Sequence, residues 1–185
     1  YRWMMMNIGK VHILGIETSA QAVVRPAPDW MLNVCCSYTY QRAQDYTDPS
    51  DNDPVSGSYK GQIAYTPWHS GSVTANLVWR TLGLNYAFVY VGERYHNSAN
   101  IAVNREQPWY THDLSASWQW RWSAWSGQLA VECNNVLSQQ YDGVLNYPMP
   151  GRNWRFIVKL NIPCRTMTLH RTSLLFLLPA LLTAC

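Results

Sequence analysis

Charged residues are scarce in this sequence, at 14% of 185 residues, against about a quarter in ordinary soluble domains. The net charge is only +3 and the basic residues are scattered, which argues against nucleic-acid binding. Phe is also scarce, with 3 residues, whereas there are 10 Trp and 12 Tyr. Trp and Tyr carry an apolar body and a polar tip, so they are favoured where a side chain is dry at one end and wet at the other.

The sequence also lacks a cysteine framework and the short motifs of catalytic sites. Cys35 and Cys36 are adjacent, so they point to opposite faces of a strand, and the other cysteines stand alone. No Cys/His spacing suggests zinc, and there is no G-x-S-x-G, HExxH or phosphate-binding loop. We therefore expect no enzymatic activity, no cofactor and no metal site.

Helical periodicity is absent before residue 167, and period-two alternation takes its place. In residues 153–162 one face carries Trp154, Phe156, Val158, Leu160 and Ile162, and the other is mostly polar. The sequence predicts seven antiparallel strands, near 8–24, 29–45, 62–79, 84–95, 109–121, 126–139 and 151–162. The predicted fold is all-β, an up-and-down meander of transmembrane strands.

The connections between these strands alternate in length. Residues 25–28, 80–83 and 122–125 form short turns, whereas 46–61, 96–108 and 140–150 form long polar loops. This asymmetry is typical of outer-membrane barrels. Aromatic residues gather at both ends of the strands: Trp30, Trp79, Trp120, Trp122 and Trp125 near the turns, and Tyr38, Tyr40, Tyr65, Tyr95 and Tyr110 near the loops.

Two aromatic girdles around an aliphatic band are what such a barrel needs at the two headgroup layers. A soluble, Trp-rich β-sandwich that binds carbohydrate would show the same alternation, and it is the alternative. It would have no reason to place aromatic residues at both ends of its strands.

Four stretches carry a resemblance to a known family: "NIGKVHILGIETSA", "YTPWHSGSVTANL", "YVGERY" and "NVLSQQYDGVLNYPMPGRNWRFIVKLNI". Residues 5–162 resemble the C-terminal barrel strands of TonB-dependent outer-membrane receptors of the cobalamin and ferric-siderophore types. The most specific part is the last strand, whose signature falls on Tyr147, Pro148, Pro150, Gly151, Arg152, Trp154, Phe156, Val158, Leu160 and Ile162. Ile162 stands where the family usually has an aromatic residue.

The resemblance implies a fragment of a receptor that imports a large scarce nutrient across the bacterial outer membrane. The plug domain is absent from the sequence, so contact with the energy-coupling TonB protein would require that missing part, and transport by the chain alone is not expected. The implied partners are outer-membrane lipid, the barrel-assembly machinery and a surface lipoprotein. Ligand contacts in the family come from long loops and the plug, which singles out Arg94, His96, Tyr141 and Tyr147.

The loop at residues 45–53 is rich in carboxylates. Its oxygens could hold Ca²⁺, but it lacks the glycine and the distal glutamate of an EF-hand, so a solvated loop is favoured.

The last part of the sequence breaks the alternation. Residues 167–171 supply a short basic start through His170 and Arg171, and residues 174–182 are apolar but too short to span a bilayer. Leu182, Thr183, Ala184 and Cys185 resemble a lipobox. We expect residues 1–163 to be barrel strands and 164–185 to be a tail resembling a lipoprotein signal peptide, from an overlapping reading frame. The alternative for the tail is a hydrophobic C-terminal helix.

Overall fold

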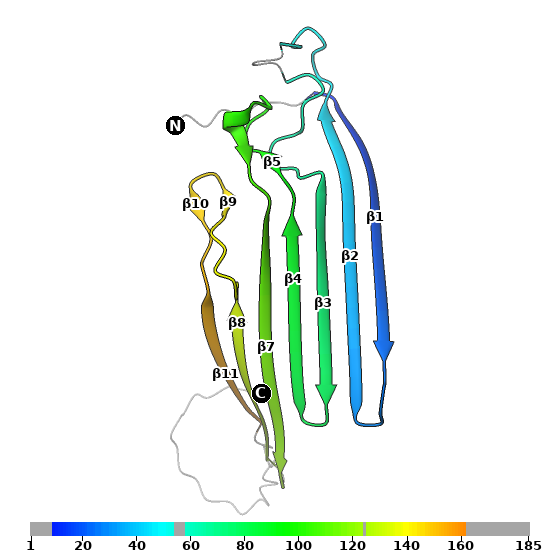
Figure 1. Cartoon of the computed structure of the whole chain (residues 1–185), viewed down its shortest axis with the longest axis vertical. Helices are drawn as coiled ribbons and strands as arrows, with labels where there is room; N and C mark the ends of the chain where they lie inside the picture. Colours follow the sequence, from blue (N-terminus) through cyan, green and yellow to red (C-terminus); the bar gives the residue numbers. More distant parts are fainter. Residues whose placement is uncertain (1–8, 54–57, 124, 162–185) are drawn as a thin grey trace, which may run out of the picture.

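The computed structural model describes residues 9–53, 58–123 and 125–161. Seven antiparallel strands form one sheet in the order β1-β2-β3-β4-β7-β8-β11, as Figure 1 shows. Their bounds are β1 Val11–Val24, β2 Trp30–Asp45, β3 His69–Trp79, β4 Leu82–Val91, β7 Trp109–Trp122, β8 Trp125–Asn134 and β11 Asn153–Asn161. The predicted meander of seven strands is confirmed.

The strands are long for a globular protein. β2 has 16 residues and β11, the shortest of the seven, has 9, whereas strands of globular proteins average about 5–6 residues. A tilted strand that crosses a bilayer needs about 9–11 residues. The length of each strand therefore matches a membrane crossing.

The strand register sorts apolar side chains onto one face of the sheet. Leu77, Leu84, Ala116, Val131 and Phe156 lie opposite one another in a single row that crosses five strands. Because side chains alternate along a strand, this face also carries the residues two and four positions away. We call it the apolar face.

The neighbouring row belongs to the other face and is polar throughout. Asn76, Asn85, Ser115, Glu132 and Arg155 lie opposite one another across the same five strands. Within this row Asn85 donates a hydrogen bond to Ser115 (3.1 Å), and Arg155 pairs with Glu132. We call this the polar face.

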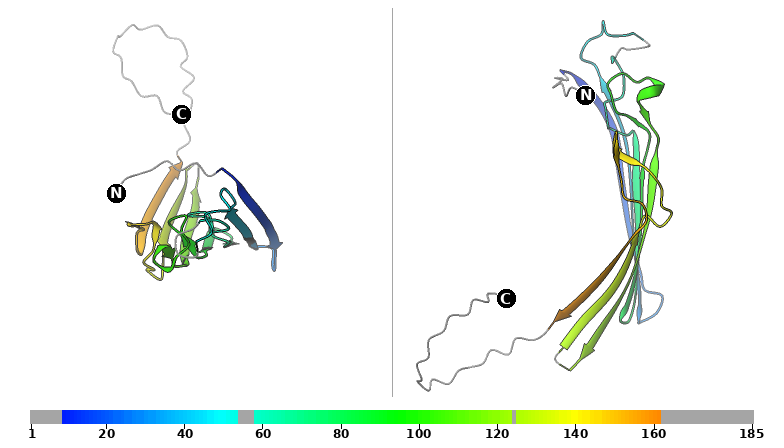
Figure 2. Two further views of the ribbon diagram at one scale, coloured as in Figure 1. Left: turned by 90° about the horizontal axis from the view of Figure 1, so that it is seen from above. Right: turned by 90° about the vertical axis from the view of Figure 1, so that its left-hand side faces the viewer.

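Nothing among the described residues covers the apolar face. Leu84 is 53% exposed and Phe156 is 74% exposed, and Figure 2 shows one curved layer with the first and last strands at its two sides. Only Ala43 and Cys133 are buried apolar residues in the described ranges. A two-layer sandwich requires a packed core between its sheets, so the soluble alternative is wrong about the fold.

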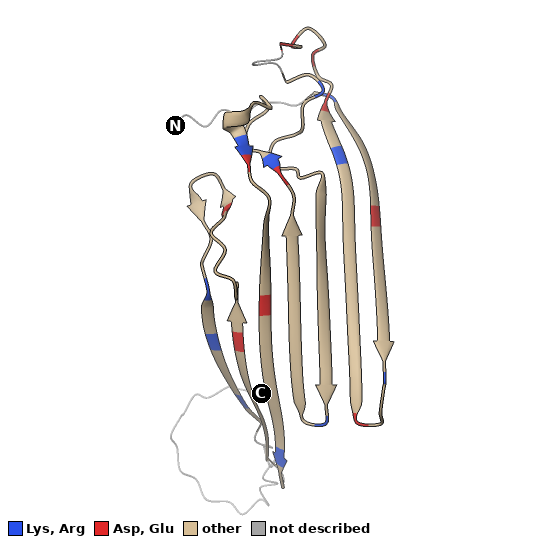
Figure 3. Cartoon of the chain, viewed as in Figure 1, with Lys and Arg blue, Asp and Glu red and all other residues tan. Residues whose placement is uncertain are grey.

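Charged side chains within the seven strands keep almost entirely to the polar face. Figure 3 shows them spaced along strands that are otherwise uncharged. The strand register places Glu17, Asp113, Arg121, Glu132, Arg155 and Lys159 on the polar face. Arg42 is the exception; it lies near the loop end of β2 and its guanidinium stacks 5.4 Å from the ring centroid of Trp68. None of the described residues forms a helix long and apolar enough to cross a membrane.

The two ends of the sheet differ as predicted. Short turns join β1 to β2, β3 to β4 and β7 to β8 at one end, and the long loops lie at the other (Figure 1). Arg80 and Ser123 adopt φ angles of 52° and 54° in the two tightest turns, the left-handed geometry that two-residue hairpin turns need.

Three strand boundaries differ from the prediction. β3 begins at His69 rather than near 62, because Pro67 has no N–H for the ladder and Tyr65 has a φ of 56°. β4 ends at Val91 rather than near 95, before Gly92. β8 ends at Asn134 rather than near 139, because Asn135 turns the chain with a φ of 50°.

The aromatic residues form two groups on the apolar face. At the turn end Trp30 stacks on Trp79 with ring centroids 5.4 Å apart, and Trp122 lies opposite Trp125. At the loop end Tyr38 and Tyr40 both contact the ring of His69. The two girdles are thus present, but Tyr65 and Tyr95 belong to the loops and not to the sheet.

Candidate functional site

The long loops carry structure of their own at one end of the sheet. β5 (Arg94–Tyr95) pairs with β6 (Arg105–Glu106), with the short 3-10 helix η1 (Ala102–Asn104) between them, and β9 (Asp142–Val144) pairs with β10 (Tyr147–Pro148). We call residues 46–53, 58–68, 92–108 and 135–152 the loop cap. None of its short elements was predicted from the sequence.

Arg94 connects two of the loops. It is only 4% exposed, and its Nη2 donates hydrogen bonds to the backbone oxygens of Asp142 (2.8 Å) and Gly143 (3.1 Å). Its Nη1 is buried with no partner among the described residues. Arg94, predicted as a ligand contact, therefore holds the β9–β10 hairpin against the loop that follows β4.

A second connection joins the loop after β2 to the loop after β4. The backbone N–H of Gln62 donates to Asn100 Oδ1, and Asn100 Nδ2 donates to the backbone oxygen of Gln62 at 3.1 Å. The Gln62 side chain is buried and donates to the backbone oxygen of Thr66 at 2.6 Å. These bonds and Arg94 together tie all three loops into one unit.

Tyr141 packs at the base of the same unit. Its ring stacks on Trp109 with centroids 4.2 Å apart. Burial raises the pKa of Tyr141 above its ordinary value, and the nearby Asp113 carboxylate raises it further. The phenol therefore keeps its proton, and its ability to donate a hydrogen bond, to a higher pH than an ordinary tyrosine.

The other two predicted ligand contacts, His96 and Tyr147, do not take part in these connections between loops. His96 Nδ1 lies 3.1 Å from Glu106 Oε1, and both side chains are largely buried. Tyr147 is 67% exposed at the β9–β10 hairpin. Of the four predicted residues the structure brings Arg94 and Tyr141 to one hairpin, whereas only Tyr147 offers a ring freely to solvent.

The loop cap contains a cavity of about 400 Å³ that sequence analysis missed. Its lining residues include Lys60, Gln62, Trp68, Tyr95, Asn100 and Pro108, and none of the four predicted residues. Trp68 Nε1 is buried with no hydrogen-bond partner in the described part of the chain. The indole N–H and the Lys60 ammonium are donors, and the Glu93 carboxylate, which pairs with Arg105, also lines the cavity. The cavity therefore suits a polar ligand that offers acceptor oxygens to the two donors.

The acidic loop uses its carboxylates locally. Asp45 accepts a hydrogen bond from the Thr47 N–H (2.8 Å), and Asp48 accepts from both the N–H and the hydroxyl of Ser50 (2.9 and 2.7 Å). The Ser50 bonds lower the pKa of Asp48. These are turn-forming contacts, and the described residues contain no cluster of three metal-ligating side chains.

The C-terminal signature divides between the loop cap and the sheet. Trp154, Phe156, Val158 and Leu160 lie on the apolar face and are 61–74% exposed. Arg152 donates from Nε to the backbone oxygen of Val136 at 2.7 Å, and a side chain on Gly151 would meet the Ser138 hydroxyl at 3.1 Å. Ile162 and the lipobox residues Leu182, Thr183, Ala184 and Cys185 lie outside the described residues.

Comparison with known proteins gives one family. The family model described as "TonB dependent receptor-like, beta-barrel" matches residues 2–136. No curated protein matches the chain by sequence.

Solved structures show the same fold. The ferric yersiniabactin uptake receptor FyuA of Yersinia pestis matches with a TM-score of 0.53 and 20% identity, over 82% of this chain and 22% of the receptor. The ferric-catecholate import receptor Fiu of E. coli K12, in its closed form, matches with a TM-score of 0.54 and 17% identity, over 78% of this chain and 20% of the receptor. The chain thus spans about a fifth of the length of these receptors.

Proposed function

The chain belongs to the TonB-dependent receptor family, and we propose that its loop cap contributes part of the binding site for an imported metal chelate. Members of this family are transporters and not enzymes, which agrees with the expectation of no catalytic activity. The family is one of the bacterial outer membrane, which supports that location for this chain. The nutrient, the import step and the coupling to TonB belong to the proposal.

The observation that carries the proposal is the polar cavity between two tied loops, with two donor side chains in its lining. Ferric siderophores present acceptor oxygens, which the unpaired indole N–H of Trp68 and the ammonium of Lys60 can meet. A corrinoid is the second candidate, from the resemblance of the last strand. The exposed Tyr147 ring adds a stacking surface on the β9–β10 hairpin of the loop cap, and Tyr141 and His96 stay part of the proposed binding site.

The proposal is tested by uptake into cells that make a receptor containing this chain and no other receptor of the family. Uptake of ⁵⁵Fe-labelled ferric siderophores and ⁵⁷Co-labelled cobalamin is measured for the wild type and for Trp68→Phe. The variant keeps the ring and removes the N–H, so the apparent affinity should fall about three- to tenfold for the true ligand, the value of one hydrogen bond.

Trp109→Phe is the matched control. Trp109 also has a buried indole N–H without a partner among the described residues, but it does not line the cavity. Its replacement should leave the affinity unchanged. Equal losses in the two variants, or no uptake of either labelled ligand, would refute the proposed site.

The domain boundaries stay part of the proposal. Residues 1–163 would supply barrel strands, and residues 164–185 would be the signal peptide of a lipoprotein encoded in an overlapping frame. Intact-mass measurement tests the second point, because an unlipidated tail on the mature protein would exclude processing at Cys185.

A further inference from the structure

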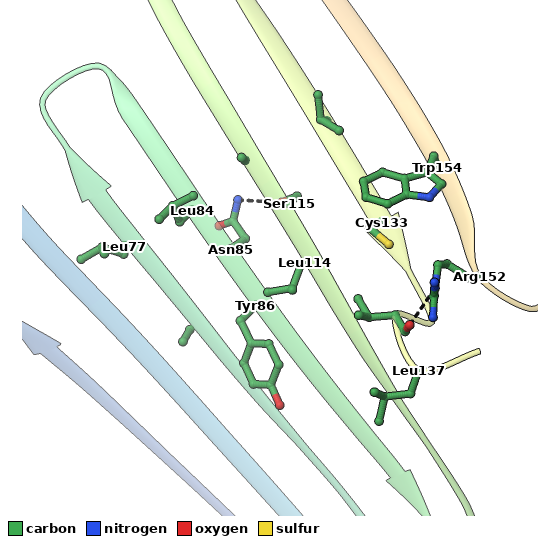
Figure 4. Close-up of a pocket in the computed structure, with 14 residues that line it drawn as sticks. Leu77, Leu84, Asn85, Tyr86, Leu114, Ser115, Cys133, Leu137, Arg152 and Trp154 are labelled. Carbon is green, nitrogen blue, oxygen red and sulfur yellow. Dashed lines mark hydrogen bonds between the residues drawn. The ribbon is translucent and has the colours of Figure 1, made fainter. Parts of the chain in front are cut away.

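Two cavities on the apolar face join into one trough. They have volumes of about 700 and 340 Å³, and both are lined by Leu77, Leu84, Ala116 and Val131. Because they share these side chains, they form a continuous depression, which we call the apolar trough. Figure 4 shows its larger part, with Leu77 and Leu84 on one side and Trp154 and Arg152 on the other.

The strand register explains the hollow. Ala116 lies between Leu84 and Val131 in one row of the apolar face. Cys133 lies between Leu114 and Trp154 in the next row of that face toward the loop end. Small side chains in the middle of each row leave space that larger neighbours wall in. The trough therefore follows from the sequence and not from a missing layer of protein.

One end of the trough reaches the aromatic girdle at the turn end of the sheet. Trp30, Trp79 and Trp118 line the smaller cavity. Arg152 lines the larger cavity, and Leu129 of the smaller cavity lies opposite Val158, six positions further along the chain. At about 3.3 Å per residue the trough is roughly 20 Å long along the strands, which with a strand tilt of about 45° covers about half of a hydrocarbon core about 30 Å thick.

At the loop end the trough meets a single cation. Arg152 is the only charged residue among the described residues that line the two cavities. Its Nε is bound to the backbone oxygen of Val136 (2.7 Å), and it forms no ion pair with any acidic side chain in the described ranges. The Nη groups thus remain for an external anion, and the planar fork of arginine suits phosphate.

We propose that the apolar trough holds an acyl chain of a phosphate-bearing membrane lipid whose phosphate binds Arg152. An apolar channel that ends in one unpaired cation complements an amphiphile with one anionic head. The lipid belongs to the leaflet on the loop side, because Arg152 lies at the loop end of the sheet. The inference depends on the membrane location of the family and not on the proposed import.

Native mass spectrometry of a complete receptor that contains this chain, purified in detergent, tests the proposal. The receptor is titrated with dioleoyl phosphatidylglycerol and with dioleoyl monogalactosylglycerol, which has the same acyl chains but no phosphate. The phosphate lipid should bind about tenfold more tightly, and Arg152→Gln should remove that difference, as expected for one charge-assisted contact. Lys159→Gln, on β11 but on the polar face, should change neither affinity.

Two further variants distinguish binding of the lipid phosphate from binding of the acyl chain. Ala116→Leu fills the trough and should weaken both lipids while leaving Arg152 in place. Arg152→Lys keeps the charge, so it should retain most of the selectivity even if the bond to Val136 is lost.

Glycerol 3-phosphate, which has the anion but no acyl chain, should not bind measurably. The proposal is overturned if Arg152→Gln and Lys159→Gln behave alike, if both lipids bind equally to the wild type, or if glycerol 3-phosphate binds as well as the lipid. None of these results bears on the uptake of a metal chelate, so the two proposals fail separately.

Discussion

Replacing Arg94 with methionine should loosen the β9–β10 hairpin without unfolding the sheet. The guanidinium makes two hydrogen bonds to backbone oxygens of that hairpin and is 4% exposed. Hydrogen bonds from a charged donor contribute about 1.5–3 kcal/mol each. Methionine keeps an apolar stem of similar size, so the change removes the bonds with little loss of packing.

The net effect is smaller than the sum of the two bonds. Burying a charge is costly, and Nη1 is already without a partner among the described residues. Removing the guanidinium also removes the cost of burying its charge, and this offsets part of the loss of the two hydrogen bonds. The net loss in the local stability of the hairpin is then about 2 kcal/mol. Because about 1.4 kcal/mol is a factor of ten, amide exchange in β9 and β10 should become roughly thirtyfold faster.

Hydrogen exchange measured by mass spectrometry checks this value, with Arg105→Met as the control. Arg105 lies opposite Tyr95 in the β5–β6 pair, and its ion pair with Glu93 is about half exposed. Such pairs contribute about 0–1 kcal/mol, so exchange in the hairpin should hardly change. If Arg94→Met left the protection of β9 and β10 intact, the stack of Tyr141 on Trp109 would be the true anchor and the reasoning would be wrong.

Three other changes test the sheet and the loop cap. Leu84→Arg places a charge on the apolar face two positions from the row of Trp79 and Trp118, so it should cost about 1–2 kcal/mol, between the midplane and interface values, and lower the folded fraction in an outer-membrane assembly assay. Asn85→Arg, on the polar face, should assemble normally. Gly127→Ala should destabilise the sheet by about 1–3 kcal/mol in denaturant titration, because the new methyl would lie 2.3 Å from the Trp120 ring, and Trp120→Leu should restore it. The pKa of Tyr141 is raised in the folded loop cap, so its contribution is complete below the ordinary value of 10.0 and is lost as the pH rises through the folded pKa. Absorbance titration at 295 nm should show one tyrosine that ionises late, and Tyr141→Phe should abolish that step.

The sheet could be predicted because its pattern is local. Each strand pairs with strands adjacent in the chain, and alternation within one strand decides which face meets lipid. The rows through Leu84 and Asn85 follow from that alternation once the turns fix the register. The predicted strand boundaries were wrong where a single residue redirects the backbone, as Asn135 does with a φ of 50°.

The loop cap could not be predicted, because distant side chains hold it together. Arg94 reaches residues 48 and 49 positions away, and Gln62 bonds to Asn100 across 38 positions. No periodicity marks such contacts. The local signals were Asn135 and Asn146, because asparagine tolerates the left-handed turns that they make with φ angles of 50° and 63°.

The two edges of the sheet connect its geometry to its role. Within the described residues β1 pairs only with β2 and β11 pairs only with β8, so each leaves a row of backbone N–H and C=O groups without a partner. In hydrocarbon each unpaired group costs several kcal/mol, which only a closed barrel avoids. The exposed apolar face requires lipid, and lipid requires further strands on both edges. The fold is therefore stable in a membrane only as an arc of a larger barrel, which agrees with its match to about a fifth of each solved receptor.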